Sequence, residues 1–344
     1  MRLSWQRIRL KVASAFRTAR AVRTDKETLW LRLQHGGIEG WGEAVPMDTY
    51  HQTLASAEAT LEAIASESNT WIGSAPLPPI ESITRDLLRR FDDQRATVAA
   101  IDAALHDWVG KRFGVPVARW LGLDPTNPPL TSYTIGIDDP ATIAAKTEAA
   151  RSYPILKIKV GTPQDEETLS TIRKIAPHKP IRLDANMAWS VDEALDRLPR
   201  LAKYGIEFVE QPLAADDIAG LRTLKEAAIC PIVADESCVR TADVVRLGSG
   251  SCVDGINIKL SKCGGIREAM KMIHLARGFG LKIMLGCMIE SSLGIAAAAH
   301  LGSSVDSLDL DGHLLLAEDP FTGIGGRQGR VRISEKPGLG VEPA

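Results

Sequence analysis

Five ionisable residues recur at nearly constant spacing through the second half of the chain. They are Lys159, Asp184, Glu210, Asp235 and Lys259, separated in turn by 25, 26, 25 and 24 residues. Each ends or follows a short apolar run of the kind that predicts a buried β-strand. A buried core gains nothing from charged groups, so their shared position predicts that they converge on one pocket where strands end.

Three of these residues are carboxylates on consecutive predicted strands: Asp184, Glu210 and Asp235. Carboxylates held close together repel one another and raise one another's pKa values, and a divalent cation removes that conflict. Three oxygen ligands with no His or Cys nearby favour Mg²⁺, with Mn²⁺ as the alternative, over Zn²⁺. The competing interpretation is that each carboxylate pairs with a local Arg or Lys.

The two lysines suggest the reaction. Lys159 and Lys259 lie on the second and sixth of eight predicted strands, so in a closed barrel they approach the pocket from opposite walls. Two bases that face opposite sides of one carbon can carry out a 1,1-proton transfer, with a cation beside the adjacent carboxylate stabilising an enediolate. Lys157 shares a strand face with Lys159. The competing interpretation is that both lysines are ordinary ion-pair partners of the carboxylates.

These side chains need a scaffold, and the chain beyond residue 130 supplies the pattern for one. Short apolar runs alternate there with helical stretches, at residues 131–135, 156–160, 181–184, 207–210, 232–235, 255–259, 282–286 and 307–311. Repeated βα units predict a parallel sheet, and eight strands with seven connections predict a closed (β/α)7β barrel, a modified TIM barrel. An open doubly wound sheet is the alternative, but no Gly-rich phosphate loop follows the first strand.

The first part of the chain has a different pattern. Alternating or apolar strands at residues 3–12, 29–34 and 38–44 precede helical patterns at 53–67, 81–91 and 97–112. Strands followed by segregated helices predict an α+β module. Near the C-terminus, residues 330–334 predict one more strand, which could pack back on that module.

Composition limits the function classes. The 344 residues include 41 basic and 43 acidic side chains, a net charge of −2, which argues against a nucleic-acid or membrane-surface partner. No run of about 18 apolar residues predicts a transmembrane helix. Five widely spaced cysteines without a C-x-x-C pair favour a reducing compartment, so we expect a cytoplasmic protein. The Arg-rich first 23 residues could form a transit peptide, but residues 7–12 alternate as a strand does.

Short motifs around the spaced residues resemble the enolase superfamily, and within it the muconate-lactonizing subgroup. They are Lys157-Ile158-Lys159, Asp184-Ala185-Asn186, Glu210-Gln211-Pro212, Ala234-Asp235-Glu236-Ser237 and Asn257-Ile258-Lys259, with Gly40-Trp41-Gly42-Glu43-Ala44 and residues 100–105 in the first module. The resemblance implies an α+β capping domain at residues 1–122, a (β/α)7β barrel at 123–312, and a segment at 313–344 that packs back on the capping domain. It also implies that Lys159 and Lys259 are the acid/base pair and that the three carboxylates bind Mg²⁺.

The predicted eighth strand narrows the substrate class. Period two places Asp309 and Asp311 on one face of that strand, opposite the strand of Glu210. A substrate whose carboxylate lies on the metal could place an α-ammonium group between these aspartates, which indicates a dipeptide. Together with residues 286–290, the Asp-x-Asp pattern is similar to dipeptide epimerases, including the L-Ala-D/L-Glu epimerases. The alternative is that the two aspartates only cap the strand end.

The likeness to dipeptide epimerases implies further substrate contacts. Thr134, Cys287 and Ile289 would line the substrate pocket, and Lys157 would contact substrate as well. Residues 16–23 resemble the segment from which some Ala-Glu epimerases supply an arginine to the distal carboxylate of the substrate, a group that guanidinium binds in a bidentate manner. Arg20 is our candidate for this role, and Arg23 is its rival.

The function expected from the sequence is a Mg²⁺-dependent dipeptide epimerase of the cytoplasm that acts in murein peptide metabolism. Its expected partners are the dipeptide substrate and copies of itself in a homo-oligomer, with no nucleic-acid or membrane partner. One set of alternatives keeps the fold and the metal: an N-acylamino-acid racemase, a muconate cycloisomerase or an o-succinylbenzoate synthase. A Schiff-base aldolase would instead use one lysine as a nucleophile. A non-catalytic module would bind a peptide without exchanging its protons.

Overall fold

Eight parallel strands form the centre of the computed structural model, which describes residues 1–72 and 77–344. They are β4 (Tyr133–Ile135), β5 (Leu156–Lys159), β6 (Ile181–Asp184), β7 (Ile206–Glu210), β8 (Ile232–Ala234), β9 (Gly255–Ile258), β10 (Lys282–Gly286) and β11 (Ser307–Asp309). The strands are hydrogen-bonded in sequence order, and a bridge from Thr131 to Leu308 joins the two ends of the sheet. The sheet is therefore a nearly closed barrel, as predicted, and not an open doubly wound sheet.

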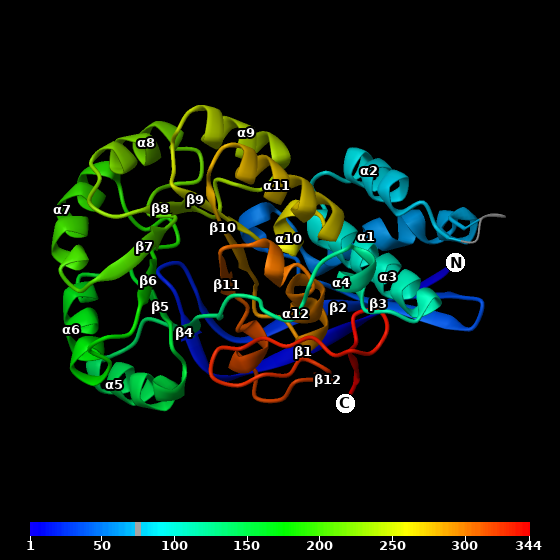
Figure 1. The fold of residues 1–344 in the computed structure, drawn as a ribbon, viewed down its shortest axis with the longest axis horizontal. Coiled ribbons are helices and arrows are strands. Elements are labelled where there is room, and N and C mark those ends of the chain that lie inside the picture. The colour runs from blue at the N-terminus through cyan, green and yellow to red at the C-terminus, as the bar shows by residue number, and fades with distance from the viewer. Residues whose placement is uncertain (73–76) are drawn as a thin grey trace.

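Helices in all seven connections surround this barrel (Figure 1). They are α5 (Pro140–Ala149), α6 (Asp165–Ile175), α7 (Val191–Ala202), α8 (Ile218–Glu226), α9 (Thr241–Ser249), the short α10 (Leu260–Cys263) with α11 (Ile266–Gly278), and α12 (Ser292–Ala299). In α7, for example, Ser190 begins the helix with a capping box, and Ala194, Leu198 and Leu201 bury one face. The order of elements confirms the predicted (β/α)7β barrel.

The N-terminal module consists of an antiparallel sheet covered by helices. Its elements are β1 (Arg2–Arg17), β2 (Val22–His35), β3 (Ile38–Ala44), α1 (Leu54–Ala65), α2 (Ile80–Arg90), α3 (Arg95–Phe113) and α4 (Val117–Trp120). Strand β3 lies so close to α3 that a Cβ atom at Gly42 would be 1.9 Å from the Ala100 carbonyl oxygen. This close approach requires the glycine of the Gly-Trp-Gly-Glu motif.

Hairpin β1–β2 extends from this module to the barrel. In Figure 1 the end of the hairpin (blue) reaches the barrel beside β4, and the Ile137 amide donates a hydrogen bond of 2.9 Å to the Arg17 carbonyl oxygen. Glu43, at the end of β3, makes a second connection, because its carboxylate accepts hydrogen bonds from the Ser291 and Gly294 amides at the start of α12. The module is thus fixed over the barrel end at which the strands finish.

The C-terminal segment packs back on the N-terminal module, as expected. The Leu339 amide donates to Asp107 of α3 at 2.7 Å, and the Phe321 ring meets Trp30 of β2 edge-on with 4.5 Å between centroids. The predicted strand at 330–334 was wrong. Residues 330–334 form only an isolated bridge, between Arg332 and Gly325, and the strands of this segment are β12 (Phe321–Thr322) and β13 (Glu342–Pro343). The domain boundaries at 122 and 312 stay predictions.

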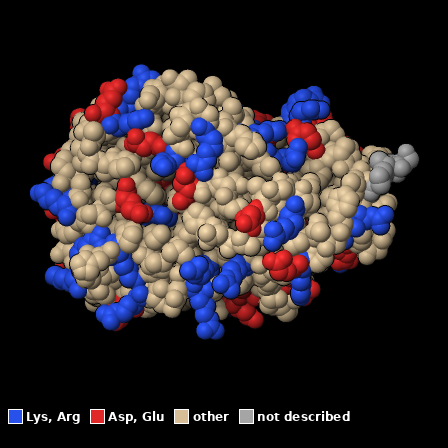
Figure 2. Space-filling view, viewed as in Figure 1, with Lys and Arg blue, Asp and Glu red and all other residues tan. Residues whose placement is uncertain are grey.

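The surface charge and the helices of the structure agree with what the composition predicted. Acidic and basic side chains are interspersed over the face shown in Figure 2, and neither sign dominates it. Among the helices of residues 1–72 and 77–344, none combines the length and apolar character that a membrane span requires.

Candidate active site

One pocket collects side chains from the ends of the barrel strands and from the N-terminal module. The barrel contributes Thr134, Lys157, Lys159, Asp235, Lys259, Cys287, Ile289, Asp309 and Asp311 to its lining, and the N-terminal module contributes Phe16, Arg20, Arg23, Lys26 and Tyr50. Asp184 and Glu210 lie behind this lining, and both are fully buried. The structure therefore brings together all the residues singled out in the sequence, including both candidate arginines.

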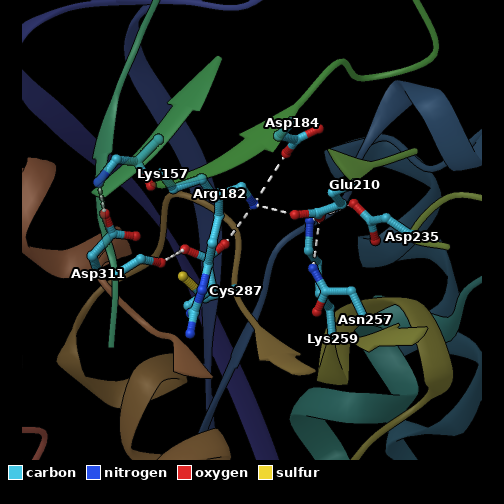
Figure 3. A network of polar contacts seen from close by, with 12 residues as sticks. Lys157, Arg182, Asp184, Glu210, Asp235, Asn257, Lys259, Cys287 and Asp311 are labelled. Carbon is cyan, nitrogen blue, oxygen red and sulfur yellow. Dashed lines mark hydrogen bonds and ion pairs between the residues drawn. The ribbon is translucent and has the colours of Figure 1, made fainter. Parts of the chain in front are cut away.

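The three carboxylates lie side by side at neighbouring strand ends (Figure 3). Asp184 of β6 is the register partner of Glu210 of β7, and Asp235 follows directly after β8. Their residues are 0%, 0% and 1% exposed. Parallel strands of a barrel end at the same rim, so residues spaced by one βα unit of 25 or 26 residues come to lie next to one another there, as the sequence predicted.

Lysine ammonium groups lie among these carboxylates. The Lys157 Nζ atom is 3.0 Å from Asp184 Oδ2 and 2.7 Å from Glu210 Oε2. Lys159 Nζ is 2.6 Å from Asp184 Oδ2, and Lys259 Nζ is 2.7 Å from Asp235 Oδ2. The ion pairs between lysines and carboxylates that the sequence analysis considered as an alternative are thus present. They link the three lysines with the three carboxylates in a network of charges.

Burial and these charges set the pKa values of the acids. Burial raises the pKa of Glu210 to about 7, and the negative charge of Asp184 adds to this more than Lys157 removes. Burial also disfavours ionisation of Asp184, but Lys157 and Lys159 more than offset it and lower its pKa to about 2. Of these two acids, Glu210 is the one whose pKa stays raised, because the positive charge near it does not offset its burial.

The acids have the chemistry of a hard-cation site. In residues 1–72 and 77–344 no three acidic, His or Cys side chains are placed so that they could enclose an ion, because the Lys157 ammonium lies between Asp184 and Glu210. The donor set is all oxygen, however, and the buried Glu210 Oε2 accepts no hydrogen bond despite its contact with Lys157. A divalent cation in place of that ammonium would supply the charge and the partner that Glu210 lacks, so the residues fit Mg²⁺.

Two residues to which the sequence assigned no role, Lys262 and Asn257, hold this network in place. Lys262, fully buried in α10, pairs with the Asp235 carboxylate and donates to the carbonyl oxygens of Asp235 at 2.6 Å and Asn257 at 2.8 Å. The Asn257 amide nitrogen donates to Glu210 Oε1 at 2.8 Å (Figure 3). The sequence could have indicated Lys262 because it lies one helical turn after Lys259, a spacing that places two side chains on the same side of a helix.

The two candidate acid/base lysines approach the pocket from different strands. Lys159 ends β5 and Lys259 directly follows β9, so four of the eight strand steps separate them around the barrel. Both side chains are mostly buried and both line the pocket. Burial lowers the pKa of Lys259, but the charges of Asp235 and Glu210 more than offset this and raise it above its usual range.

The predicted eighth strand extended two residues too far. Strand β11 ends at Asp309, and Asp311 begins the 3₁₀ helix at residues 312–315, so only the first aspartate belongs to the strand. Both still line the pocket. Asp309 Oδ2 is 2.6 Å from Lys157 Nζ, and Asp311 Oδ2 accepts a 2.6 Å hydrogen bond from the Thr134 amide. Burial and the Asp309 charge raise the pKa of Asp311 to about 6.

Residues of the N-terminal module form the other side of the pocket. Arg20 is exposed and its guanidinium contacts Met187 Sδ at 3.5 Å, whereas Arg23 is partly buried. Tyr50, which the sequence did not single out, also lines the pocket, and burial and the charge of Asp235 raise its pKa well above the ordinary value. Across the pocket, Cys287 Sγ accepts a hydrogen bond from the Gly312 amide at 3.3 Å.

Glu290, which follows β10 of the barrel, interacts with the charge of Glu43 of the N-terminal module and makes the free energy of unfolding depend on pH. Burial and the neighbouring Glu43 charge raise the pKa of Glu290 to about 8. A carboxyl group whose pKa rises on folding stabilises the fold below its unfolded pKa of about 4.3, and this contribution is lost as the pH rises through the folded value. We expect the free energy of unfolding in urea to fall between about pH 5 and about pH 8.5, and Glu290→Gln to reduce that fall by roughly 4 kcal/mol. The remaining fall comes from other buried acids with raised pKa values, such as Glu210 and Asp311.

The exposed Glu335 provides the control for this experiment, because its substitution Glu335→Gln changes the same charge at the surface. That variant should follow the wild-type pH profile. An unchanged profile in Glu290→Gln would contradict the assignment.

Comparison with known proteins identifies the family. Residues 6–122 match the N-terminal domain of the mandelate racemase/muconate lactonizing enzymes, and residues 141–344 match the enolase C-terminal domain-like family. An L-Ala-D/L-amino acid epimerase from a Maribacter species is 37% identical, with 99% of each chain covered, and an L-Ala-D/L-Glu epimerase from Bacteroides thetaiotaomicron is 36% identical over 99% of this chain and 88% of its own.

Solved structures show the same relationship. The dipeptide epimerase from Enterococcus faecalis, complexed with Mg and L-Leu-L-Tyr, superposes with a TM-score of 0.91 at 32% identity, over 99% of this chain and 98% of the other. The substrate-liganded L-Ala-D/L-Glu epimerase from Bacillus subtilis gives a TM-score of 0.92 at 32% identity, over 100% and 99%. With both of its domains matched, this chain belongs to the mandelate racemase/muconate lactonizing enzymes of the enolase superfamily.

Proposed function

We propose that this chain is a Mg²⁺-dependent dipeptide epimerase that inverts the α-carbon of the C-terminal residue of L-Ala-D/L-Glu or a related dipeptide. The observation that carries the proposal is one pocket in which two lysines from strands four steps apart flank a cluster of buried carboxylates. Relatives of this chain that carry the name epimerase cover its whole length, which supports an isomerase.

The lysines perform the proton transfers. Lys159 or Lys259 removes the α-proton from one face of the substrate carbon, and the other lysine returns a proton to the opposite face. Asp184, Glu210 and Asp235 would hold Mg²⁺, which when bound supplies positive charge beside the substrate carboxylate. Lys262 and Asn257 keep Asp235 and Glu210 in place through their hydrogen bonds.

The remaining pocket residues bind and orient the dipeptide. Asp309 and Asp311 would receive the α-ammonium group, and Lys157 would turn from the carboxylates toward the substrate carboxylate. Thr134, Cys287 and Ile289 would contact the peptide, and Arg20 would reach its side chain from the opposite side of the pocket.

The wider proposal concerns the setting of the reaction. The five cysteines are free, which supports a reducing cytoplasm, and a dipeptide of alanine and glutamate would come from murein peptide metabolism. We expect Mn²⁺ to replace Mg²⁺ in assays, because both are hard cations bound by oxygen ligands. We also expect a homo-oligomer in solution and no nucleic-acid or membrane partner.

The test follows the α-proton of the substrate. Incubation with L-Ala-L-Glu and Mg²⁺ in D₂O should replace the glutamate α-proton with deuterium and yield the L,D-diastereomer, both seen by ¹H NMR. The N-acetylated dipeptide should react much more slowly, because it lacks the ammonium group that the two aspartates would bind. Faster reaction of the acetylated compound would favour an N-acylamino-acid racemase instead. No exchange with any member of a dipeptide library would refute the proposed function.

A further inference from the structure

The wall of the pocket formed by the N-terminal module is positively charged. Arg20, Arg23 and Lys26 line this wall, and among the lining residues that the structure describes there, none is Asp or Glu. The acidic residues of the pocket all come from the barrel side, which binds the reacting part of the substrate. The charge of this wall therefore favours an anionic group at the far end of the substrate.

Lys26 is more buried than Arg20. It lies on β2 opposite Leu10 of β1, and its ammonium donates a hydrogen bond to the Pro46 carbonyl oxygen. In the described part of the chain no carboxylate oxygen lies within 4 Å of it. Arg20, by contrast, is exposed to solvent.

Burial makes the charge of Lys26 costly without a partner. Burial, and after it the charge of Arg23 on the same strand, lower the pKa of Lys26 to about 8. Asp48 after β3, Glu43 at the end of β3 and Glu27 on β2 raise it only in part. A carboxylate brought into the pocket would supply the missing counter-charge.

We propose that Lys26, with Arg23 beside it, binds the side-chain carboxylate of an acidic C-terminal residue of the dipeptide and so selects Asp or Glu at that position. This inference rests on the proposed function and assigns the side-chain contact to Lys26 in addition to the arginine expected from the sequence. A side chain with the shape of glutamate but no charge would lose this interaction.

The experiment compares L-Ala-L-Glu with its neutral isostere L-Ala-L-Gln in the wild type and in Lys26→Met. We expect Lys26→Met to lower kcat/KM for L-Ala-L-Glu about 10- to 100-fold, as for a hydrogen bond to a charged group. The value for L-Ala-L-Gln should change less than about threefold, since the reacting groups are untouched. Lys26→Arg should keep the preference for glutamate, and Lys26→Glu should invert it in favour of L-Ala-L-Lys.

Two controls test whether the loss of preference for glutamate is specific to the charge of Lys26. Lys11→Met removes an exposed cation from the adjacent strand β1, outside the pocket, and should leave the Glu/Gln ratio unchanged. The ratio of kcat/KM values for the two substrates should also fall as the pH rises through about 8, because Lys26 then loses its proton in the free enzyme. Effects on the catalytic lysines cancel in this ratio.

The outcomes are distinguishable. If the wild type exchanges the α-proton of no dipeptide, the proposed function fails. If the wild type is active but Lys26→Met changes the two substrates equally, or changes neither, the assignment of Lys26 is overturned while the function stands. Lys26→Met could lose activity on both substrates because it folds poorly, which a lowered Tm would show. In that case Lys26→Arg decides: the assignment holds only if this variant keeps the wild-type Tm and the wild-type ratio of kcat/KM values for L-Ala-L-Glu and L-Ala-L-Gln.

Discussion

The substitutions Lys159→Met and Lys259→Met should each abolish the interconversion of L-Ala-L-Glu and L-Ala-D-Glu. Loss of a positioned acid or base reduces a rate by about 10²- to 10⁴-fold, and inversion needs both lysines. Each single variant should, however, retain exchange of the α-proton in one of the two diastereomers, because the remaining lysine still faces one side of the carbon. The two variants should retain it for opposite diastereomers. Chiral chromatography measures inversion, and ¹H NMR in D₂O measures exchange.

The exposed Lys174 on α6 provides the matched control, since Lys174→Met removes a lysine far from the pocket lining. It should keep full activity. Each active-site lysine contacts a buried carboxylate, so thermal unfolding must show that Lys159→Met and Lys259→Met remain folded. Full epimerase activity in either variant, or exchange of the same diastereomer in both, would refute the two-base scheme.

Removal of the divalent cation should have the second large effect. Chelation with EDTA should abolish activity, and Mg²⁺ at 100 times its Kd should restore it and stabilise the fold by about 2.7 kcal/mol, as mass action requires. Glu210→Gln should lose both the activity and the rise in Tm with Mg²⁺, because it removes one of three carboxylate ligands. Activity assays and thermal unfolding with a Mg²⁺ titration measure these quantities.

Strand β7 itself carries the control for this prediction. Glu207 pairs with Arg182, and its side chain is 40% exposed, so Glu207→Gln changes the same residue type on the same strand without reaching the carboxylate cluster. Its response to Mg²⁺ should equal that of the wild type. A Glu210→Gln protein that Mg²⁺ still stabilises and activates would show that this carboxylate is not a ligand.

The barrel could be predicted because its strands are short apolar runs with clear ends. The predicted strands at 181–184 and 282–286 coincide with β6 and β10. The convergence of Asp184 and Glu210 followed from spacing alone, since one βα unit returns the chain to the same rim. The first strand extends to Arg17, beyond the predicted residue 12, because its outer part is held by pairing with β2 and not by an apolar pattern of its own.

Contacts that depend on tertiary packing could not be predicted in this way. No sequence pattern shows that Lys157 lies between two carboxylates or that Lys262 holds Asp235, because both depend on which strand ends are neighbours and how far each side chain reaches. Asp311 lies outside β11 because the strand ends at Asp309 and a 3₁₀ helix begins after Asp311. Lys26 lies on a polar part of β2, where only the position of the barrel reveals that it enters a pocket.

The division of the pocket between two modules has an evolutionary consequence. Residues that would recognise the variable end of a substrate lie on hairpin β1–β2 and the segment after β3, whereas the proton-transfer lysines and the acids lie on barrel strands. Mutations in the first set can alter substrate choice and leave the chemistry intact. Gene libraries randomised at positions 20, 23, 26 and 50 should therefore yield catalysts with new preferences far more often than libraries randomised at the strand ends.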